Sequence, residues 1–212
     1  MILSRTVLPR TLLLLLICLI GLSVLFLINQ FTQNRISHND RAWFEAQLNS
    51  LTPTQIHDNN LLDDRVLMKA PKDLTPNNQL PVYRARLHGA PTGAVINSIT
   101  PDGYNGPIEL LVAVDYNGTI LGIRVLSHHE TPNMGDAFAK RGSTWLDNFT
   151  HHSLTNPDTR GWNVRKDGGD FDQFTSATIT PRAIIHAVQR TLDYYQRSRE
   201  LIFQTESSHQ DE

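Results

Sequence analysis

An unbroken apolar stretch near the N-terminus places the strongest constraint on this chain. No charged residue stands between Arg10 and Arg35, and residues 12–28 are almost purely aliphatic. A helix of roughly 20 apolar residues crosses a hydrocarbon core about 30 Å thick, and this stretch is long enough. A cleaved signal peptide has a shorter apolar region, of about 7–15 residues, that ends in small residues. Here the stretch instead runs on into Asn29-Gln30. The sequence therefore predicts a single transmembrane anchor over residues 1–35.

The basic residues around the anchor indicate which end faces the cytoplasm. Arg5 and Arg10 precede the apolar stretch together with the N-terminal amine, while Arg35 and Arg41 follow it at a greater distance. Loops that stay in the cytoplasm carry the excess of positive charge. We therefore expect a cytoplasmic N-terminus and an exported main domain.

Composition excludes several classes of function. A formal charge of −2 provides no clustered Lys and Arg to neutralise phosphates, so nucleic acid is not an expected partner. Cys18 is the only cysteine, which rules out an intrachain disulfide and a thiolate metal cluster. The pairs His128-His129 and His151-His152 would point to opposite faces of a strand, so no metal site is expected from them.

Residues 36–79 are expected to form a stalk and linker. Asn39 or Asp40 is a candidate N-cap for a helix that either starts there or continues the anchor. Its apolar residues recur at helical spacing at Trp43, Phe44, Leu48 and Leu51. Pro53, Pro71 and Pro76 then predict irregular structure up to residue 79.

From residue 80 onward the pattern changes to short strands and a final helix. Strands are predicted over 81–87, 94–99, 108–115 and 119–126, and Asn117-Gly118 between the last two is a hairpin signal. Thr180 is a plausible N-cap and Pro181 a first helical residue. The helix then continues with apolar residues at Ile184, Val188, Leu192 and Tyr195. Strands followed by a packing helix predict an α+β domain over 80–204 with a mainly antiparallel sheet, followed by a polar tail over 205–212.

The segment just before that helix, residues 172–181, carries the chemistry. Three hydroxyl residues and one small residue, Thr175, Ser176, Ala177 and Thr178, precede the helix N-terminus. Free N–H groups and the helix dipole favour an anion such as phosphate there. On spacing alone, the commoner interpretation is an N-cap whose threonines satisfy backbone donors.

This segment resembles a known motif. Asp-x-x-Thr-x-Ala-Thr, ending at Thr178, is similar to the flavinylation motif of the FMN-binding domains in the RnfG and NqrC families. Further matching stretches occur in the same order along the chain, at 103–108, 111–115, 125–132 and 166–169. With the N-terminal anchor, the chain resembles RnfG (also called RsxG) from about residue 80 to residue 195.

The resemblance implies a function. FMN would be joined through a phosphoester to Thr178 by a separate flavin transferase that uses FAD as the donor. The chain would then be an electron-transfer subunit of a membrane-bound, ion-translocating oxidoreductase complex of the Rnf or Rsx type, not a stand-alone enzyme. It would pass once through the bacterial inner membrane, with its main domain in the periplasm. Its partners would be the lipid bilayer, the transferase and the other subunits.

The resemblance also implies the residues of the cofactor site. Thr175, Ser176 and Ala177 would wrap the phosphate and the ribityl chain. Glu130, Thr131 and Met134 would line the isoalloxazine, and Lys166 would supply a positive charge. The family usually has glycine at position 176, where serine adds a Cβ to a tight approach. It usually has leucine at 134, which flexible methionine can replace.

Two other functions fit the same sequence. The Ser176 departure keeps open a structural or assembly subunit of the same kind of complex that carries no flavin. The third interpretation is a membrane-anchored sensory or binding module with an unrelated ligand. Flavin colour that depends on the Thr178 hydroxyl separates the first interpretation from the other two.

Overall fold

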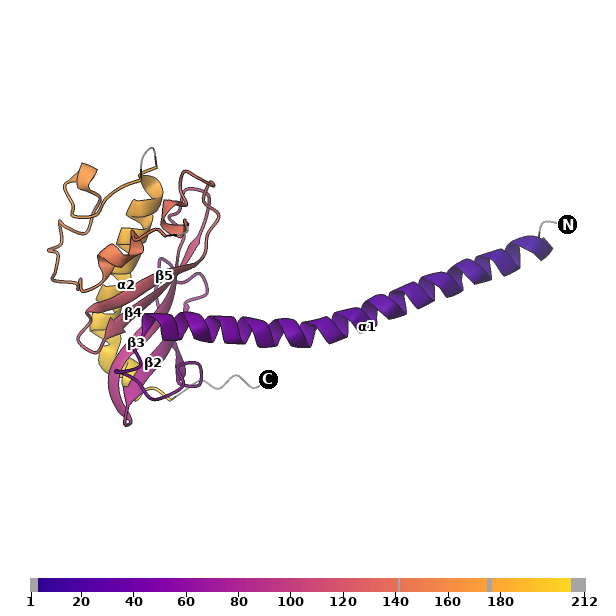
Figure 1. Cartoon of the computed structure of the whole chain (residues 1–212), viewed down its shortest axis with the longest axis horizontal. Helices are drawn as coiled ribbons and strands as arrows, with labels where there is room; N and C mark the ends of the chain where they lie inside the picture. The colour runs from indigo at the N-terminus through magenta and orange to yellow at the C-terminus, as the bar shows by residue number, and fades with distance from the viewer. Residues whose placement is uncertain (1–3, 141, 175–176, 207–212) are drawn as a thin grey trace. The chain divides into compact units, whose positions relative to one another are not determined.

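The computed structural model describes residues 4–140, 142–174 and 177–206, with side chains at 12–29 and from 39 onward (Figure 1). The chain divides into two compact units, Met1–Phe44 and Glu45–Glu212. Each unit is considered by itself below.

Helix α1 spans Ser4–Leu51. Its part up to Phe44 belongs to the first unit, and its last residues, from Glu45, belong to the second. Its segment Leu12–Asn29 has a mean hydropathy of 2.9, and its side chains are exposed. By length and composition this segment can cross a membrane. No new helix begins at Asn39 or Asp40, so the residues after the anchor continue the anchor helix to Leu51.

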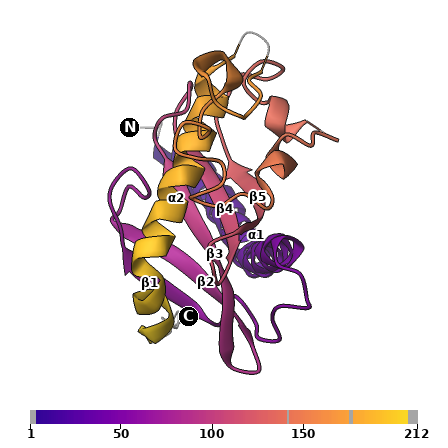
Figure 2. The same ribbon diagram turned by 90° about the vertical axis from the view of Figure 1, so that its left-hand side faces the viewer.

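The second unit is built on a five-stranded antiparallel sheet. Its strands are β1 (Arg65–Lys69), β2 (Gln79–Leu87), β3 (Ala90–Thr100), β4 (Ile108–Asp115) and β5 (Ile120–Ser127). They lie in the order β1-β2-β3-β4-β5, so every strand pairs with its neighbour in sequence. Figure 2 shows helix α2 (Ile179–Gln204) crossing one face of this sheet. The α+β fold with an antiparallel sheet and a packing C-terminal helix is therefore confirmed.

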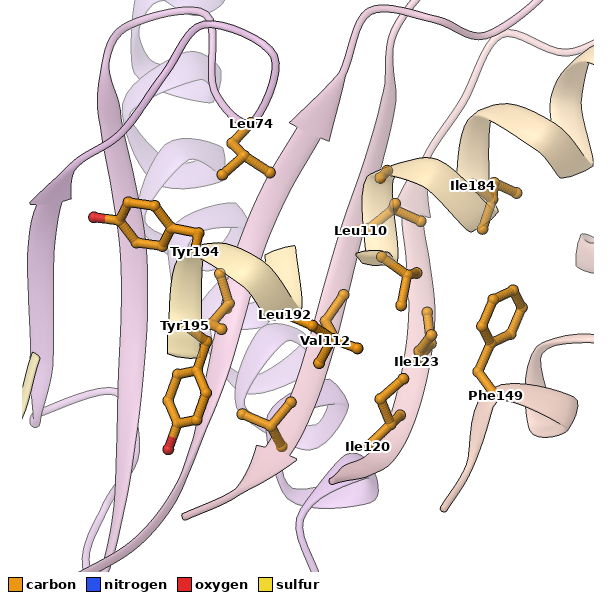
Figure 3. Close-up of a cluster of buried hydrophobic side chains, with 14 of the residues drawn as sticks. Leu74, Leu110, Val112, Ile120, Ile123, Phe149, Ile184, Leu192, Tyr194 and Tyr195 are labelled. Atoms are coloured by element: carbon orange, nitrogen blue, oxygen red, sulfur yellow. The ribbon is translucent and has the colours of Figure 1, made fainter. Parts of the chain in front are cut away.

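The main core lies between this face and α2. Ile184, Leu192 and Tyr195 of α2 meet Leu110 and Val112 of β4, and all are buried (Figure 3). Complete burial of one such aliphatic side chain stabilises the fold by roughly 1.5–3 kcal/mol. This core fixes the position of α2, and with it the segment just before the helix.

The opposite face of the sheet is covered in part by the end of α1. Leu48 and Leu51 are buried, and a Cβ built on Gly122 of β5 would lie 3.0 Å from Leu51 Cδ2. Burial on this side of the sheet raises the pKa of Tyr83, opposed by the nearby Arg65. The last turns of α1 are therefore an integral part of the second unit.

Strand β1 lies in the range that was expected to be irregular. Val66 and Met68 face the core and Leu67 points outward, because alternate residues of a strand point to opposite faces. The strand is only five residues long and has basic residues at both ends, which weakened its signal in the sequence. The division into anchor, linker and domain at residues 35 and 79 stays a prediction.

The β4–β5 hairpin forms where Asn117-Gly118 predicted it. Gly118 has φ +92° and its N–H donates to the Asp115 carbonyl at 3.1 Å, while the Asp115 N–H donates to the Thr119 carbonyl at 2.9 Å. Only the glycine adopts positive φ, so the loop is one residue longer than a two-residue turn.

Candidate functional site

A cavity of about 280 Å³ opens where three segments meet at one end of the second unit. The segments are the loop between β3 and β4, the loop after β5, and the start of α2. Its lining residues are Tyr104, Glu130, Thr131, Met134, Gly135, Ala177, Thr178, Ile179 and Thr180. Functional cavities of this kind usually combine apolar walls with a few placed polar groups, and both kinds of residue are present here.

The carboxylate of Glu130 joins the three segments. Its side chain is buried; Oε2 accepts a hydrogen bond from the Thr180 hydroxyl at 2.5 Å, and Oε1 accepts one from the Asn105 backbone N–H at 3.4 Å. A Cβ built on Gly103 would lie 2.8 Å from Oε1, and one on Gly135 would lie 2.7 Å from Oε2. Both glycines are thus required by the close approach of backbone to this carboxylate. Glu130 therefore links the three segments that form the wall of the cavity.

Helix α2 begins earlier than its sequence predicted. Ile179 is the first helical residue and Thr178 is the N-cap, so the assignment of Thr180 as N-cap was wrong. Pro181 did not fix the start, because the N–H groups of the whole first turn lack helical partners and proline is tolerated throughout it. The Thr180 hydroxyl does not cap the helix, since it donates to Glu130.

The hydroxyl of Thr178 is half-buried and makes no capping hydrogen bond. It lines the cavity at the N-terminal end of α2, where the helix dipole is positive and the backbone N–H groups of the first turn are free of helical partners. A hydroxyl that makes no capping hydrogen bond, at a place that favours anions, is suited to carry a phosphate group.

The apolar part of the lining is exposed at the mouth of the cavity. Tyr104 is 65% exposed, Met134 51% and Ile179 46%. Exposed apolar side chains that line a cavity offer a surface that a flat aromatic ligand can cover.

The segment that leads to Thr178 is anchored in the core by aromatic side chains. Phe174 is buried and lies 4.9 Å from Trp145 between ring centroids. The indole N–H of Trp145 donates to the Asp172 carbonyl at 2.7 Å. The Ala177 N–H donates to the Phe174 carbonyl at 3.2 Å. These contacts hold Asp172, Phe174 and Ala177, the described residues that precede Thr178.

Five of the residues predicted from the sequence lie together in the lining: Glu130, Thr131, Met134, Ala177 and Thr178. Thr175 and Ser176 fall outside the described residues. Lys166 is exposed in a single 3-10 turn, Arg165–Asp167, and is not part of the lining. Its charge near a cofactor stays a prediction.

Four lining residues were missed. Tyr104 lies in a matched stretch and Ile179 directly follows the motif, so both were within reach of the sequence. Gly135 was not assigned to the site, and Thr180 was assigned only as an N-cap. Lys166 is tied to the site only through its neighbours. The side chain of Asp167 forms an ion pair with Arg182 in the first turn of α2, and the Lys166 backbone N–H donates to Gln173 Oε1 at 3.3 Å.

Within the described part of the chain, no group of three or more His, Cys, Asp or Glu residues could hold a metal ion.

Comparison with known proteins gives a consistent result. The FMN-binding domain family matches residues 103–193, which include every lining residue of the cavity. A Pseudomonas aeruginosa protein, named as the G subunit of an ion-translocating oxidoreductase complex, is 42% identical over 204 residues, 96% of this chain and 95% of that protein. Proteins of the same name from Vibrio parahaemolyticus and Shewanella loihica are 44% and 39% identical, over 81% and 94% of each chain.

Proposed function

This chain belongs to the RnfG family of ion-translocating oxidoreductase complex subunits, and from that premise we propose that it relays electrons through FMN held in the cavity. The observation that carries the proposal is the hydroxyl of Thr178, which makes no capping hydrogen bond and lies on a cavity inside the FMN-binding domain. Flavin accepts two electrons and can release them singly, which suits a relay between one- and two-electron carriers. The chain would position the flavin and provide the charges around it, and other subunits would supply the electron donor and the electron acceptor.

We further propose that FMN is attached through a phosphoester to Thr178. A flavin transferase would break the pyrophosphate bond of FAD, join the FMN phosphorus to Thr178 Oγ1 and release AMP, while the hydroxyl proton is lost. Phosphate at this helix end is favoured by about 0.3–1 kcal/mol, and by up to about 2 kcal/mol if partly buried. A covalent bond prevents loss of the cofactor by dissociation.

For the other residues we propose the roles that the family resemblance implies, and five of the residues predicted for the site do line the cavity. Ala177, with Thr175 and Ser176 before it, would contact the phosphate and ribityl chain. Glu130, Thr131 and Met134 would face the isoalloxazine, and the exposed rings and methyl groups of the rim, including Tyr104, would be covered by it. Lys166 would add a positive charge from the neighbouring loop.

The anchor helix would place this domain at a bacterial inner membrane. We propose one pass over Leu12–Asn29, with the N-terminus in the cytoplasm and the domain in the periplasm, because Arg5 and Arg10 lie closest to the apolar segment. Alkaline phosphatase fused after Glu212 should be active and green fluorescent protein at the same place dark. The reverse pattern would overturn this orientation.

The first experiment is in-gel flavin fluorescence of the full chain coexpressed with a flavin transferase and run under denaturing conditions. Wild type should fluoresce, and Thr178→Val should lose essentially all of the signal. Thr144→Val, at an exposed threonine outside the cavity, is the matched control and should stay fluorescent. A dark wild-type band, with the transferase shown to be active on another substrate, would sink the covalent relay. Copurification of that dark protein with its complex would then favour the assembly role, and no copurification would favour the sensory module.

A further inference from the structure

A second hollow lies along the outer edge of the sheet, away from the lining of the flavin cavity. Strand β5 is the last strand of the sheet and pairs on its inner side with β4. On its outer side only Ile120 is paired: its N–H donates to the His152 carbonyl at 2.8 Å, and its carbonyl accepts from the His151 N–H at 2.9 Å. From Gly122 to Leu126, no outer backbone hydrogen bond to another described residue is formed.

The hollow, called the β5 groove below, has a volume of about 460 Å³ and borders this edge, beside the 3-10 helix Leu146–Phe149 that packs against β5. Four consecutive strand residues, Ile123–Leu126, line it. Successive side chains of a strand point to opposite faces, so side chains from both faces of the sheet border one space only at the sheet edge. Further lining residues come from the loop after β5 and from the end of α1; they include Phe138, Ala139, Lys140, Gly142, Ser143, Leu146, Asp147 and Gln47.

The charge of the β5 groove is predominantly positive. Arg124 and Lys140 line it, both are exposed, and neither forms an ion pair with another described residue. Asp147 is the single acidic residue of the lining. The other edge strand, β1, is only five residues long and ends in Lys69. An edge that short is a common way to discourage strand pairing, whereas β5 offers eight residues.

We propose that the β5 groove binds an extended acidic segment of another subunit, which adds to the sheet as a sixth strand. Strand addition supplies main-chain hydrogen bonds to an exposed edge, and side chains of opposite charge set the specificity. The pairing with β4 shifts register near each end of β5, which leaves a regular stretch over Gly122–Val125. The incoming strand is therefore short, about four or five residues.

Charge also selects this occupant over a second copy of the chain. Antiparallel pairing of β5 with β5 of another copy would bring the basic residues Arg124 and Lys140 of both copies into one interface. Like charges across a strand pair are destabilising. An acidic partner strand instead neutralises both residues.

The β5 groove and the flavin cavity share one segment of the chain. His128 and Phe138 line the groove, while Glu130 and Met134, which lie between them in sequence, line the cavity. A strand docked on β5 would therefore fix its own subunit beside the flavin cavity. The proposal does not depend on covalent attachment of the flavin.

Hydrogen exchange provides the first test. The full chain is measured in detergent alone and after coexpression and purification with the other subunits. Outward-facing amides of Gly122–Val125 should exchange at least about tenfold more slowly in the complex, whereas the Ile120 amide, already bonded to His152, and the amides of β1 should not change. Equal rates at β5 in both states would overturn the proposal.

Charge reversal provides the second test. Arg124→Glu with Lys140→Glu should lower the yield of copurified complex by about tenfold or more, since facing like charges cost several kcal/mol. The matched control is Lys69→Glu with Lys72→Glu, at two exposed lysines on and near the other sheet edge. In-gel flavin fluorescence of both double variants should equal that of wild type, so loss of docking is distinguished from loss of cofactor. Normal yield from the Arg124 and Lys140 variant would contradict the proposal.

A photo-crosslinking residue at position 124 identifies the occupant. Mass spectrometry should map the crosslink to an acidic stretch of another subunit. Crosslinks to a second copy of this chain, or to lipid alone, would overturn the proposal of an acidic strand from another subunit.

Discussion

The two ends of helix α2 differ in how completely their polar groups are used. At the first turn, the Thr178 hydroxyl makes no capping bond and borders a cavity. At the last turn, the Arg84 guanidinium donates to the Ile202 carbonyl at 3.1 Å and to the Thr205 carbonyl at 2.6 Å. The same arginine is buried and forms an ion pair with Asp64.

This contrast separates stability from function along one helix. A helix leaves four backbone donors and four acceptors without helical partners at its ends. At the C-terminal end, called the closed end below, the buried Arg84 guanidinium donates to backbone carbonyls and so holds α2 against β2. At the N-terminal end, called the open end below, the Thr178 hydroxyl makes no capping bond, which adds nothing to stability through capping but suits a phosphate group. The predictions below test this division from the largest expected effect to the smallest.

The largest effect is expected at the closed end. Arg84→Met removes the buried guanidinium, its bonds to two α2 carbonyls and its partnership with Asp64. Loss of one member of a buried ion pair destabilises by about 3–5 kcal/mol, and the lower end of this range is expected because Asp64 keeps its ion pair with Arg86. Urea unfolding of the full chain in a mild detergent measures the loss. Arg160→Met, at an exposed arginine, should cost less than about 0.5 kcal/mol. Equal costs for the two variants would remove the distinction between the two ends.

A smaller loss is expected where the open end meets Glu130. Thr180→Val deletes the hydroxyl that donates to Glu130 Oε2, and a hydrogen bond to a charged group contributes about 1.5–3 kcal/mol. Thr180→Ser keeps the hydroxyl and is the matched control. Because the cavity walls then lose their link to α2, flavin incorporation should fall in the valine variant and not in the serine variant. Full incorporation in both would show that Glu130 does not position the site.

Local patterns in the sequence were sufficient for most of the fold. Alternation and the Asn117-Gly118 signal located four of the five strands, because each strand pairs with its sequence neighbour across a short connection. Strand β1 was missed because only Val66 and Met68 face the core, and two residues are too few to show a period. Its place is determined by pairing with β2, which the sequence of β1 alone does not encode.

The site was less accessible to such reasoning. Spacing alone favoured an N-cap over an anion site before the helix, and only the family motif drew attention to Thr178. The capping role assigned to Thr180 was wrong because its partner, Glu130, lies 50 residues earlier in the chain. Contacts at that separation depend on how the loops fold over the sheet, and no local pattern carries them. The cofactor role of the lining residues remains a prediction.

The charge of Glu130 offers a finer test of the open end. A carboxylate beside the isoalloxazine disfavours the addition of electrons, so Glu130→Gln should raise the reduction potential of the bound flavin by on the order of tens of millivolts. Glutamine keeps the size of the side chain and can still accept from Thr180. Spectroelectrochemical titration of the flavinylated full chain measures the shift. An unchanged potential with full flavin content would place the ring away from Glu130.

The smallest effect concerns the pH dependence of stability that His186 confers, in the N-terminal half of α2. The pKa of His186 is lowered by partial burial and then by Arg190 and Arg182, while Asp102 and Asp167 act in the opposite direction. A histidine whose pKa is lower in the folded state binds its proton better when unfolded. Its contribution to stability is therefore complete above about pH 6.5, the unfolded value, and is lost as the pH falls through the folded value.

His186→Gln should flatten the fall in unfolding free energy between about pH 7 and pH 5 by a few tenths of a kcal/mol, because the ring is only partly buried and solvent screens its charge. Arg190→Gln should flatten it by a smaller fraction, since it removes one of two cations that act on the ring. Urea unfolding at several pH values tests both. A slope that is the same in all three proteins would mean that protons bind His186 equally well in the folded and unfolded chain. The cations beside His186 would then add no pH-dependent cost to the stability of the N-terminal half of α2.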